Sequence, residues 1–274
     1  MYEIIFRVGY RFRNLVCKIL ISWCLASCLL KANGQNPSMF DPDNGRASFG
    51  ISVLGAVYVK THISPGGGQY KLSSNHQLGY ELILHYNFLF ENNFLLSFGL
   101  GGNLVAYNFN YDIESDLFDP PTESNISSNK AASPNTDLFC LKVQAEIQRK
   151  IPIGYRKALS IGIGSSVLFA PARDEVISEY VFYPTGVTRY FLQRRQINGK
   201  NTKPWINFHA SLGHDWKLEK GHSVGIFVKL NYSPARFVSG VYDVDPGRAA
   251  PTSGQYYVTG TYIGAGVNFT LRPR

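Results

Sequence analysis

Several features that would classify a protein at once are scarce or absent in this 274-residue sequence. It contains only 2 methionines and 4 cysteines, and none of its apolar runs reaches the roughly 20 residues that a membrane-spanning helix needs. Three of the cysteines lie near the N-terminus, so removal of that segment would leave Cys140 alone and exclude an intramolecular disulfide. No linker rich in Pro, Gly or Ser divides the chain, which predicts a single domain after a leader.

The chain also has little excess of positive over negative charge once the N-terminus is set aside. The formal net charge is +8, but residues 1–34 hold five basic residues and one acid, which leaves 22 basic and 18 acidic residues in the remainder. This near balance lacks the concentrated positive charge of nucleic-acid-binding proteins, and we expect no nucleic-acid partner. Aromatic residues, by contrast, make up 14% of the chain, which suits a barrel wall whose alternate residues meet lipid.

The first 34 residues have the organisation of a signal peptide. A basic stretch, 7–18, precedes the apolar stretch Ile19–Leu30, and the small residues Ala32 and Gly34 favour cleavage before Gln35. The mature chain would then begin with a short periplasmic N-terminal segment, residues 35–46.

A second interpretation of the leader stays open. Leu25-Ala26-Ser27-Cys28 matches a lipobox, which would leave Cys28 acylated. A protein that is anchored by its own barrel wall gains little from a lipid, and the site after Gly34 is at least as good. We therefore favour cleavage near Gly34/Gln35.

Beyond residue 46, eight segments alternate apolar and polar residues. In the clearest of them, Leu78, Leu82 and Leu84 lie on one face, and Glu81 and His85 lie on the other, because side chains of a strand alternate with a period of two. The eight predicted strands are Ala47–Lys60, Gln77–Phe88, Phe94–Tyr111, Leu138–Lys150, Ala158–Ala170, Trp205–Trp216, Ser223–Tyr232 and Tyr256–Leu271.

Long and short connections follow one another between these strands. The long ones are Thr61–His76, Asp112–Asp137, Pro171–Pro204 and Ser233–Gln255. In outer-membrane barrels the short turns face the periplasm and the long loops face outside. Residues 47–274 are therefore predicted to form an all-β, eight-stranded antiparallel up-and-down transmembrane β-barrel with long extracellular loops, located in the outer membrane.

Two local irregularities accompany this prediction. The apolar face of the third strand changes parity, which predicts a bulge near Gly101–Leu104 that turns Val105 and Tyr107 outward. In the third loop, Val176–Tyr183 and Val187–Ile197 flank a turn and predict a hairpin above the membrane. A ten-stranded barrel is the alternative, although arginines on both faces of the second arm oppose it.

The inward faces carry an unusual amount of charge. An eight-stranded barrel is about wide enough for side chains alone, and buried charges must pair to offset their lost solvation. We therefore expect an interior polar network, with a gated pore or a proton path as the alternative. The inward residues are Glu81, His85, Lys142, Glu146, His209, Asp215 and Lys229.

The loops are the expected functional surface. The second loop is acidic and the third is basic, and the two could pair with each other. Alternatively, the basic hairpin binds lipopolysaccharide phosphates or an acidic partner, since arginine grips phosphate with two hydrogen bonds. The candidates for anion or partner binding are Arg189, Arg194, Arg195, Lys200 and Lys203. Asp243 and Asp245 are too few carboxylates to predict a Ca²⁺ site, and we expect no metal and no cofactor.

The C-terminal segment adds a resemblance to known proteins. Tyr262–Phe269 is similar to the C-terminal signal that the outer-membrane assembly machinery reads, and the Gln35 start is similar to that of exported proteins of Bacteroidota. Over Phe49–Leu271 the pattern resembles the PorT-like and OmpX/OmpA-type outer-membrane β-barrel families. The resemblance implies insertion by the assembly machinery, contact with outer-membrane lipid, and a role in envelope integrity, adhesion or assistance to secretion.

One motif suggests an enzyme. His209-Ala210-Ser211 resembles the His-x-Ser pair of outer-membrane lipid A deacylases. Here the pair points inward, and Leu212 stands where that family has Asn. Asp215 lies toward the end of its strand that is away from the outer leaflet. We predict a non-enzymatic barrel that acts through its loops. A narrow channel for small solutes is the first alternative, and a lipid A-modifying enzyme is the less favoured one.

Overall fold

The computed structural model describes residues 47–271 except 65–69, 91–92, 128–135, 171–173, 184–187, 198–203 and 219–221. The predicted signal peptide (1–34) with its alternative at Cys28, the segment 35–46, and the loop candidates Lys200 and Lys203 lie outside the described residues.

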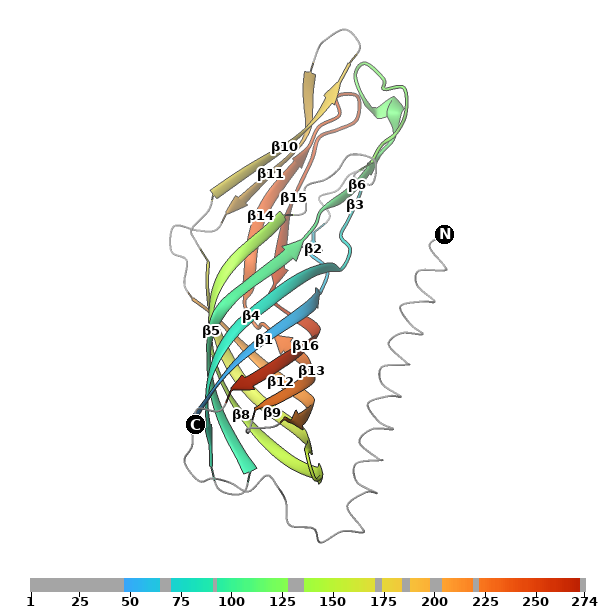
Figure 1. Cartoon of the computed structure of the whole chain (residues 1–274). Coiled ribbons are helices and arrows are strands. Elements are labelled where there is room, and N and C mark those ends of the chain that lie inside the picture. The colour runs from blue at the N-terminus through green and yellow to red at the C-terminus, as the bar shows by residue number, and fades with distance from the viewer. Residues whose placement is uncertain are drawn as a thin grey trace.

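Eight strands close into an antiparallel barrel, which confirms the predicted fold (Figure 1). The strands follow the order β1-β16-β13-β12-β9-β8-β5-β4, and β4 pairs back to β1. Closure leaves no barrel strand with an unpaired edge. The barrel strands are β1 (Ala47–Tyr58), β4 (Gln77–Leu89), β5 (Phe94–Tyr107), β8 (Thr136–Gly154), β9 (Lys157–Phe169), β12 (Trp205–Lys217), β13 (Ser223–Tyr232) and β16 (Tyr262–Leu271).

The two ends of the barrel differ. β4–β5, β8–β9 and β12–β13 are joined by short turns at one end, which we call the short-turn end. The four long connections leave from the opposite end, the long-loop end, where further strands extend the barrel (Figure 1).

The wall has an apolar outer face and a largely polar inner face over most of its height. In β4, Leu78 and Leu84 expose 64% and 61% of their surface, whereas Glu81 between them exposes 2%. All eight strands contribute exposed apolar side chains, so the apolar surface forms a closed belt. Representative members are Phe49, Leu82, Phe98, Phe139, Ile163, Phe208, Leu230 and Val267.

The predicted bulge in the third barrel strand is wrong. β5 pairs with β4 and β8 without a register shift through Gly101–Leu104. Val105 and Tyr107 keep the inward direction of Ser97 and Asn103 and are buried. The apolar pattern changes face because the interior of the barrel turns from polar to apolar toward the long-loop end, while the backbone continues unchanged.

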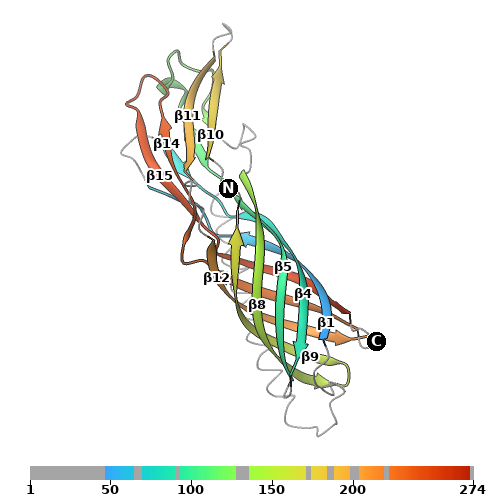
Figure 2. The same ribbon diagram turned by 90° about the vertical axis from the view of Figure 1, so that its left-hand side faces the viewer.

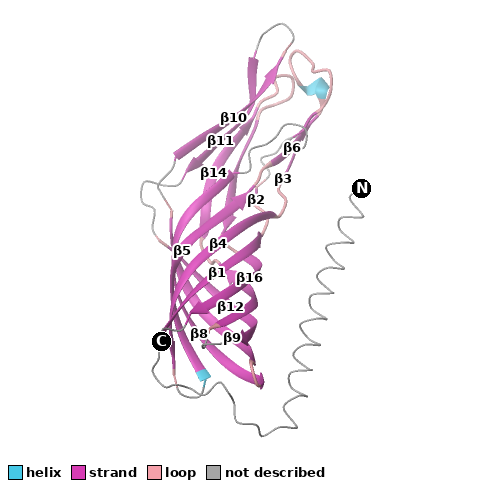
Figure 3. Cartoon of the chain, viewed as in Figure 1, coloured by secondary structure: helices cyan, strands magenta, loops and turns pink. Residues whose placement is uncertain are grey.

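Much of the long connections is also β-structure (Figure 3). β10 (Asp174–Phe182) and β11 (Thr188–Ile197) form the predicted hairpin, and their place outside the barrel excludes the ten-stranded alternative. The hairpin belongs to a five-stranded sheet, ordered β10-β11-β14-β15-β2. Its other members are β14 (Arg236–Val244), β15 (Thr252–Thr259) and β2 (His62–Ile63).

A second small sheet lies at the same end. It contains β3 (Lys71–Ser73), β6 (Asn110–Ile113) and β7 (Ile126–Ser127). The short 3-10 helix η3 (Ser115–Leu117) lies in the connection between β6 and β7 (Figure 3). Within the described residues, no helix is long and apolar enough to cross a bilayer.

The boundaries of the last predicted strand require correction. The sequence predicts one strand from Tyr256 to Leu271, but β15 ends at Thr259 and β16 begins at Tyr262. The first belongs to the five-stranded sheet and the second to the barrel. Ser233–Gln255, predicted as a loop, contains β14 and the start of β15. These loop residues form strands because they pair with segments that are distant in the sequence, and a local pattern does not reveal such pairing.

The outer sheets lie beyond the long-loop end of the barrel (Figure 2). The main apolar core contains residues of both and joins them. Phe109 packs against Tyr242 and Tyr256 with ring centroids 5.3 and 5.8 Å apart, and Tyr111 packs against Phe191 at 5.4 Å. These aromatic contacts bury large apolar areas and order the outer strands. The long connections are therefore a packed extension of the barrel over the residues that the structure describes.

Candidate functional site

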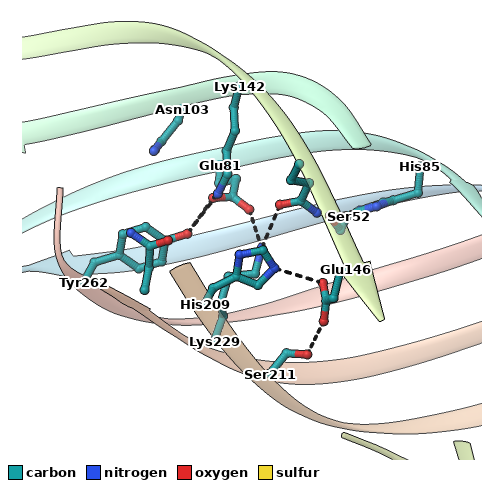
Figure 4. A network of polar contacts seen from close by, with 12 residues as sticks. Ser52, Glu81, His85, Asn103, Lys142, Glu146, His209, Ser211, Lys229 and Tyr262 are labelled. Atoms are coloured by element: carbon teal, nitrogen blue, oxygen red, sulfur yellow. Dashed lines mark hydrogen bonds and ion pairs between the residues drawn. The ribbon is translucent and has the colours of Figure 1, made fainter. Parts of the chain in front are cut away.

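A buried ion-pair network occupies the middle of the barrel (Figure 4). The Glu81 carboxylate from β4 accepts hydrogen bonds from Lys142 Nζ at 2.5 Å and from Lys229 Nζ at 2.8 Å, on β8 and β13. The Tyr262 hydroxyl of β16 donates to the same carboxylate at 2.6 Å. Lys142 exposes 0% of its surface and Glu81 2%, so these charges are removed from water. Such burial is tolerable because each charge meets an opposite one.

A second carboxylate continues the network toward the short-turn end. Glu146 of β8 lies 3.4 Å from His209 Nε2 and accepts a hydrogen bond from the Ser211 hydroxyl. β9 passes beside this cluster with Gly162 and Gly164. A Cβ at Gly164 would stand 2.6 Å from His209 Nε2, so the missing side chains make room for the cluster.

This arrangement does not match a nucleophilic triad. In a triad, histidine lies between the serine and the carboxylate, so that it can take the hydroxyl proton. Here Ser211 donates directly to Glu146, and His209 contacts the other oxygen of the same carboxylate. The carboxylate near His209 is Glu146, not the Asp215 that the sequence drew attention to. The geometry provides two stabilising contacts to a buried carboxylate, and His209 is not placed to take the serine proton.

The structure separates two predicted members from the centre. His85 lies between Ser52 and Ser97, at 2.7 and 3.1 Å from their hydroxyl oxygens. Asp215 pairs with Lys150 at 2.7 Å nearer the short-turn end. Both residues point inward, as their positions on the strands predict, but they form separate contacts.

Several participants in these contacts lie outside the predicted network, among them Tyr262, Lys150 and Ser52. Tyr262 was read as part of a C-terminal signal, although its inward position on the last strand places its hydroxyl against Glu81. Lys150 and Ser52 also occupy inward positions, so the period-two pattern could have included both. No local pattern indicates which inward side chains meet, because the partners come from strands far apart in the sequence.

The interior is closed above the network. Leu54, Tyr58, Cys140 and Leu168 are each exposed by 1% or less, and the Tyr58 hydroxyl donates to Asn103 at 2.7 Å. Below them, a polar pocket between Ser52, His85, Glu146 and Lys229 measures about 50 Å³, which is room for a few water molecules. The buried Nε2 of Gln144, which lines this pocket, has no protein partner among the described residues and suits contact with such water.

The predicted loop arginines occupy different environments. Arg194 is buried, lies 3.6 Å from Glu179 and stacks over the Phe109 ring at 5.4 Å, so its assignment to an accessible anion-binding surface is wrong. The apolar core draws it inward, where Glu179 offsets its charge. Arg195 points to the opposite face and is exposed.

Arg189 is half-exposed and ties neighbouring loops together. It lies 3.6 Å from Asp245 and donates to the Asp119 carbonyl oxygen at 3.5 Å, while Arg248 lies 3.8 Å from the Asp119 carboxylate. The acidic and basic loops therefore meet at these points. Within the described part of the chain, no group of three or more potential ligands could hold a metal ion.

No family model matches this chain. No curated protein matches it either. Among solved structures it is similar to the outer membrane protein OprG from Pseudomonas aeruginosa, with 10% identity over 84% of this chain and 98% of that chain and a TM-score of 0.37. The outer membrane protein AlkL is 13% identical over 88% of this chain and 97% of its own, with a TM-score of 0.37. The outer membrane protease OmpT from Escherichia coli is 11% identical over 86% of this chain and 99% of its own, with a TM-score of 0.29. At these TM-scores the similarities carry no argument about role, and the fold rests on the strand pairing described above.

Proposed function

We propose that this protein is an integral outer-membrane barrel that displays an ordered extracellular β-structure for binding a partner or ligand, without catalysis. The closed apolar belt carries the membrane placement. Leu78, Ile163 and Leu230 are exposed by 64%, 68% and 56%, and similar side chains surround the barrel. A soluble protein rarely exposes such a continuous apolar surface, whereas the hydrocarbon core of a membrane accommodates it.

The long-loop end supports the binding role. Its strands share an apolar core with the barrel, so their outer surfaces are held in place rather than free to move independently. Exposed on the outer face of the β10–β11 hairpin are Val176, Tyr180, Phe182, Tyr190 and Arg195. Aromatic residues and arginine are enriched at binding surfaces. The exposed Arg195 suits lipopolysaccharide phosphates or an acidic envelope protein, and Lys200 and Lys203 stay candidates from the sequence alone.

The interior supports a plug rather than a channel. A conducting path needs a continuous hydrated route, but the Glu81–Lys142–Lys229 cluster and the apolar layer above it fill the barrel. Membership in the PorT-like or OmpX/OmpA-type families, insertion by the outer-membrane assembly machinery, and assistance to secretion stay proposals that rest on the pattern of the strands.

Three measurements test this proposal. Outer-membrane fractions should contain a band whose migration on a semi-native gel changes on boiling, because a closed barrel resists detergent until it is heated. In planar bilayers the purified protein should be silent, and a steady conductance that changes in Glu81→Gln would overturn the plug and support the channel. For the binding role, Arg195→Ala, which leaves the buried Arg194 intact, should weaken retention of lipopolysaccharide. Equal retention by the variant and the unmodified protein would exclude Arg195 from the binding surface.

A further inference from the structure

Among the described residues, the exposed cations of the outer face at the short-turn end lie on one side. Strands β5, β8, β9 and β12 are neighbours in the barrel and form one continuous arc of the wall. Arg149 in the last third of β8, Arg156 in the turn, and Lys157 at the start of β9 are all exposed on this arc. Among the described residues, the other four strands reach this end without an exposed Lys or Arg. We call Arg149, Arg156 and Lys157 the cationic arc.

No carboxylate of the described residues pairs with the cationic arc. The nearest acids of the same strands point into the barrel, where Asp215 pairs with Lys150 and Glu146 lies beside His209. Both acids are buried. No described carboxylate therefore offsets the positive charge of the arc, and this charge faces outward at the edge of the apolar belt.

Aromatic side chains accompany these cations. The Arg149 guanidinium lies 5.7 Å from the centre of the Phe94 ring, and Arg156 lies 5.8 Å from that of Tyr155. Lys157 pairs in register with Trp216. Aromatic rings concentrate at the level of lipid head groups, and the long stems of Lys and Arg lie along apolar surface while their charges reach the polar layer. The arc therefore lies where the membrane belt meets the head groups.

We propose that the cationic arc binds the head groups of anionic phospholipids in the leaflet next to the short-turn end. This inference rests on the proposed membrane placement and adds a lipid preference to it. The match is one of charge and depth, because a phosphate at the belt edge meets three cations that pair with no carboxylate of the described residues. A guanidinium can donate two hydrogen bonds to one phosphate, and an ammonium adds a point charge. Zwitterionic lipids offer the phosphate but also a competing positive charge.

The position of the tryptophans allows a direct test. The chain has 3 tryptophans, Trp23, Trp205 and Trp216. Trp216 lies beside Lys157 of the cationic arc, whereas Trp205 lies at the opposite end of β12. In a Trp23→Phe/Trp205→Phe background, the protein is reconstituted into vesicles of equal phosphatidylglycerol and phosphatidylcholine. One of the two lipids carries bromine on its acyl chains, which quenches nearby tryptophan fluorescence. Brominated phosphatidylglycerol should quench Trp216 more strongly than brominated phosphatidylcholine, by about twofold or more.

A matched pair of variants assigns the preference to the arc. Arg149→Gln/Arg156→Gln/Lys157→Gln should bring the quenching ratio close to one. Arg195→Gln/Arg236→Gln/Arg248→Gln removes three cations from the long-loop end and should leave the ratio unchanged. If the arc variant fails to fold, salt provides the second measurement. The ratio of the unmodified arc should fall toward one as salt rises, since screening weakens charge attraction at the surface.

The outcomes separate this inference from the proposed function. A ratio of one with the arc intact, or an unchanged ratio in the arc variant, would overturn the lipid preference and leave the membrane placement standing. Absence of quenching by either brominated lipid would instead remove Trp216 from the membrane edge and overturn the placement itself.

Discussion

Replacing Glu81 by Gln removes the carboxylate that contacts both Lys142 and Lys229 in the barrel interior. Both lysines are nearly fully buried, at 0% and 2% exposure, so water cannot take over the role of the lost charge. Removing one partner from a buried ion pair costs about 3–5 kcal/mol, because the remaining charge is uncompensated. We expect Glu81→Gln to lower the free energy of unfolding by this amount.

The charge balance of the cluster makes the prediction sharper. Glu81 and Glu146 face two lysines, so Glu81→Gln leaves one excess positive charge and Lys142→Met leaves one excess negative charge. The double variant restores the balance between Glu146 and Lys229. It should therefore cost at least about 2 kcal/mol less than the sum of the two single variants, since residues in one network are not additive.

Urea unfolding in phospholipid bilayers, followed by tryptophan fluorescence and by migration on unboiled gels, measures these changes. Lys150→Met supplies the control, because Lys150 pairs with Asp215 and not with Glu81. Its cost should add to that of Glu81→Gln. Additive costs for Glu81→Gln and Lys142→Met, or a cost below about 1 kcal/mol for Glu81→Gln, would refute the buried network as a stabilising unit.

Three further predictions concern the wall and the outer sheets. A Cβ at Gly101 would stand 1.9 Å from the Leu82 carbonyl oxygen, whereas at Gly55 the nearest atom is 4.0 Å away, so Gly101→Ala should destabilise the barrel by about 1–3 kcal/mol and Gly55→Ala should be tolerated in the same unfolding assay. Arg194→Met should leave the Glu179 charge without its partner and speed proteolysis of the long-loop end, whereas Arg195→Ala should not; equal digestion would contradict this. Burial and the nearby Glu179 raise the pKa of Tyr111 to about 12 from 10.0. Stability of the outer sheets should then be full below pH 10 and fall as the pH rises toward 12, because the unfolded phenol ionises first; Tyr111→Phe should weaken that fall.

The barrel itself could be predicted from particular strands. Gln77–Leu89 alternates so regularly that Leu78, Leu82 and Leu84 had to share a face, and the structure exposes all three. The apolar face of β5 misled the prediction at Val105 and Tyr107, because the same inward direction passes from a polar layer into an apolar one. A sequence pattern assumes one environment for each face along the whole strand, and this barrel has two environments inside.

The candidate site was predictable as a set of inward residues but not as contacts. Glu81, Lys142 and Lys229 could be assigned to the interior from parity alone. Their meeting at one carboxylate depends on strand stagger and barrel closure, which bring residues 61 and 148 positions apart into hydrogen-bond distance. The same dependence hid the contact of Tyr262 with Glu81 and the burial of Arg194 in the outer core.

By itself, the sequence determined the number of barrel strands, the two faces of each barrel strand and the alternation of short turns with long connections. Side-chain direction in a strand has a period of two, and that period is a local property of the backbone. Only the tertiary structure decided which inward charges pair, where the interior becomes apolar, and that the long connections pack into sheets. Those features depend on distances between strands that are remote in the chain, and closure of the barrel sets these distances.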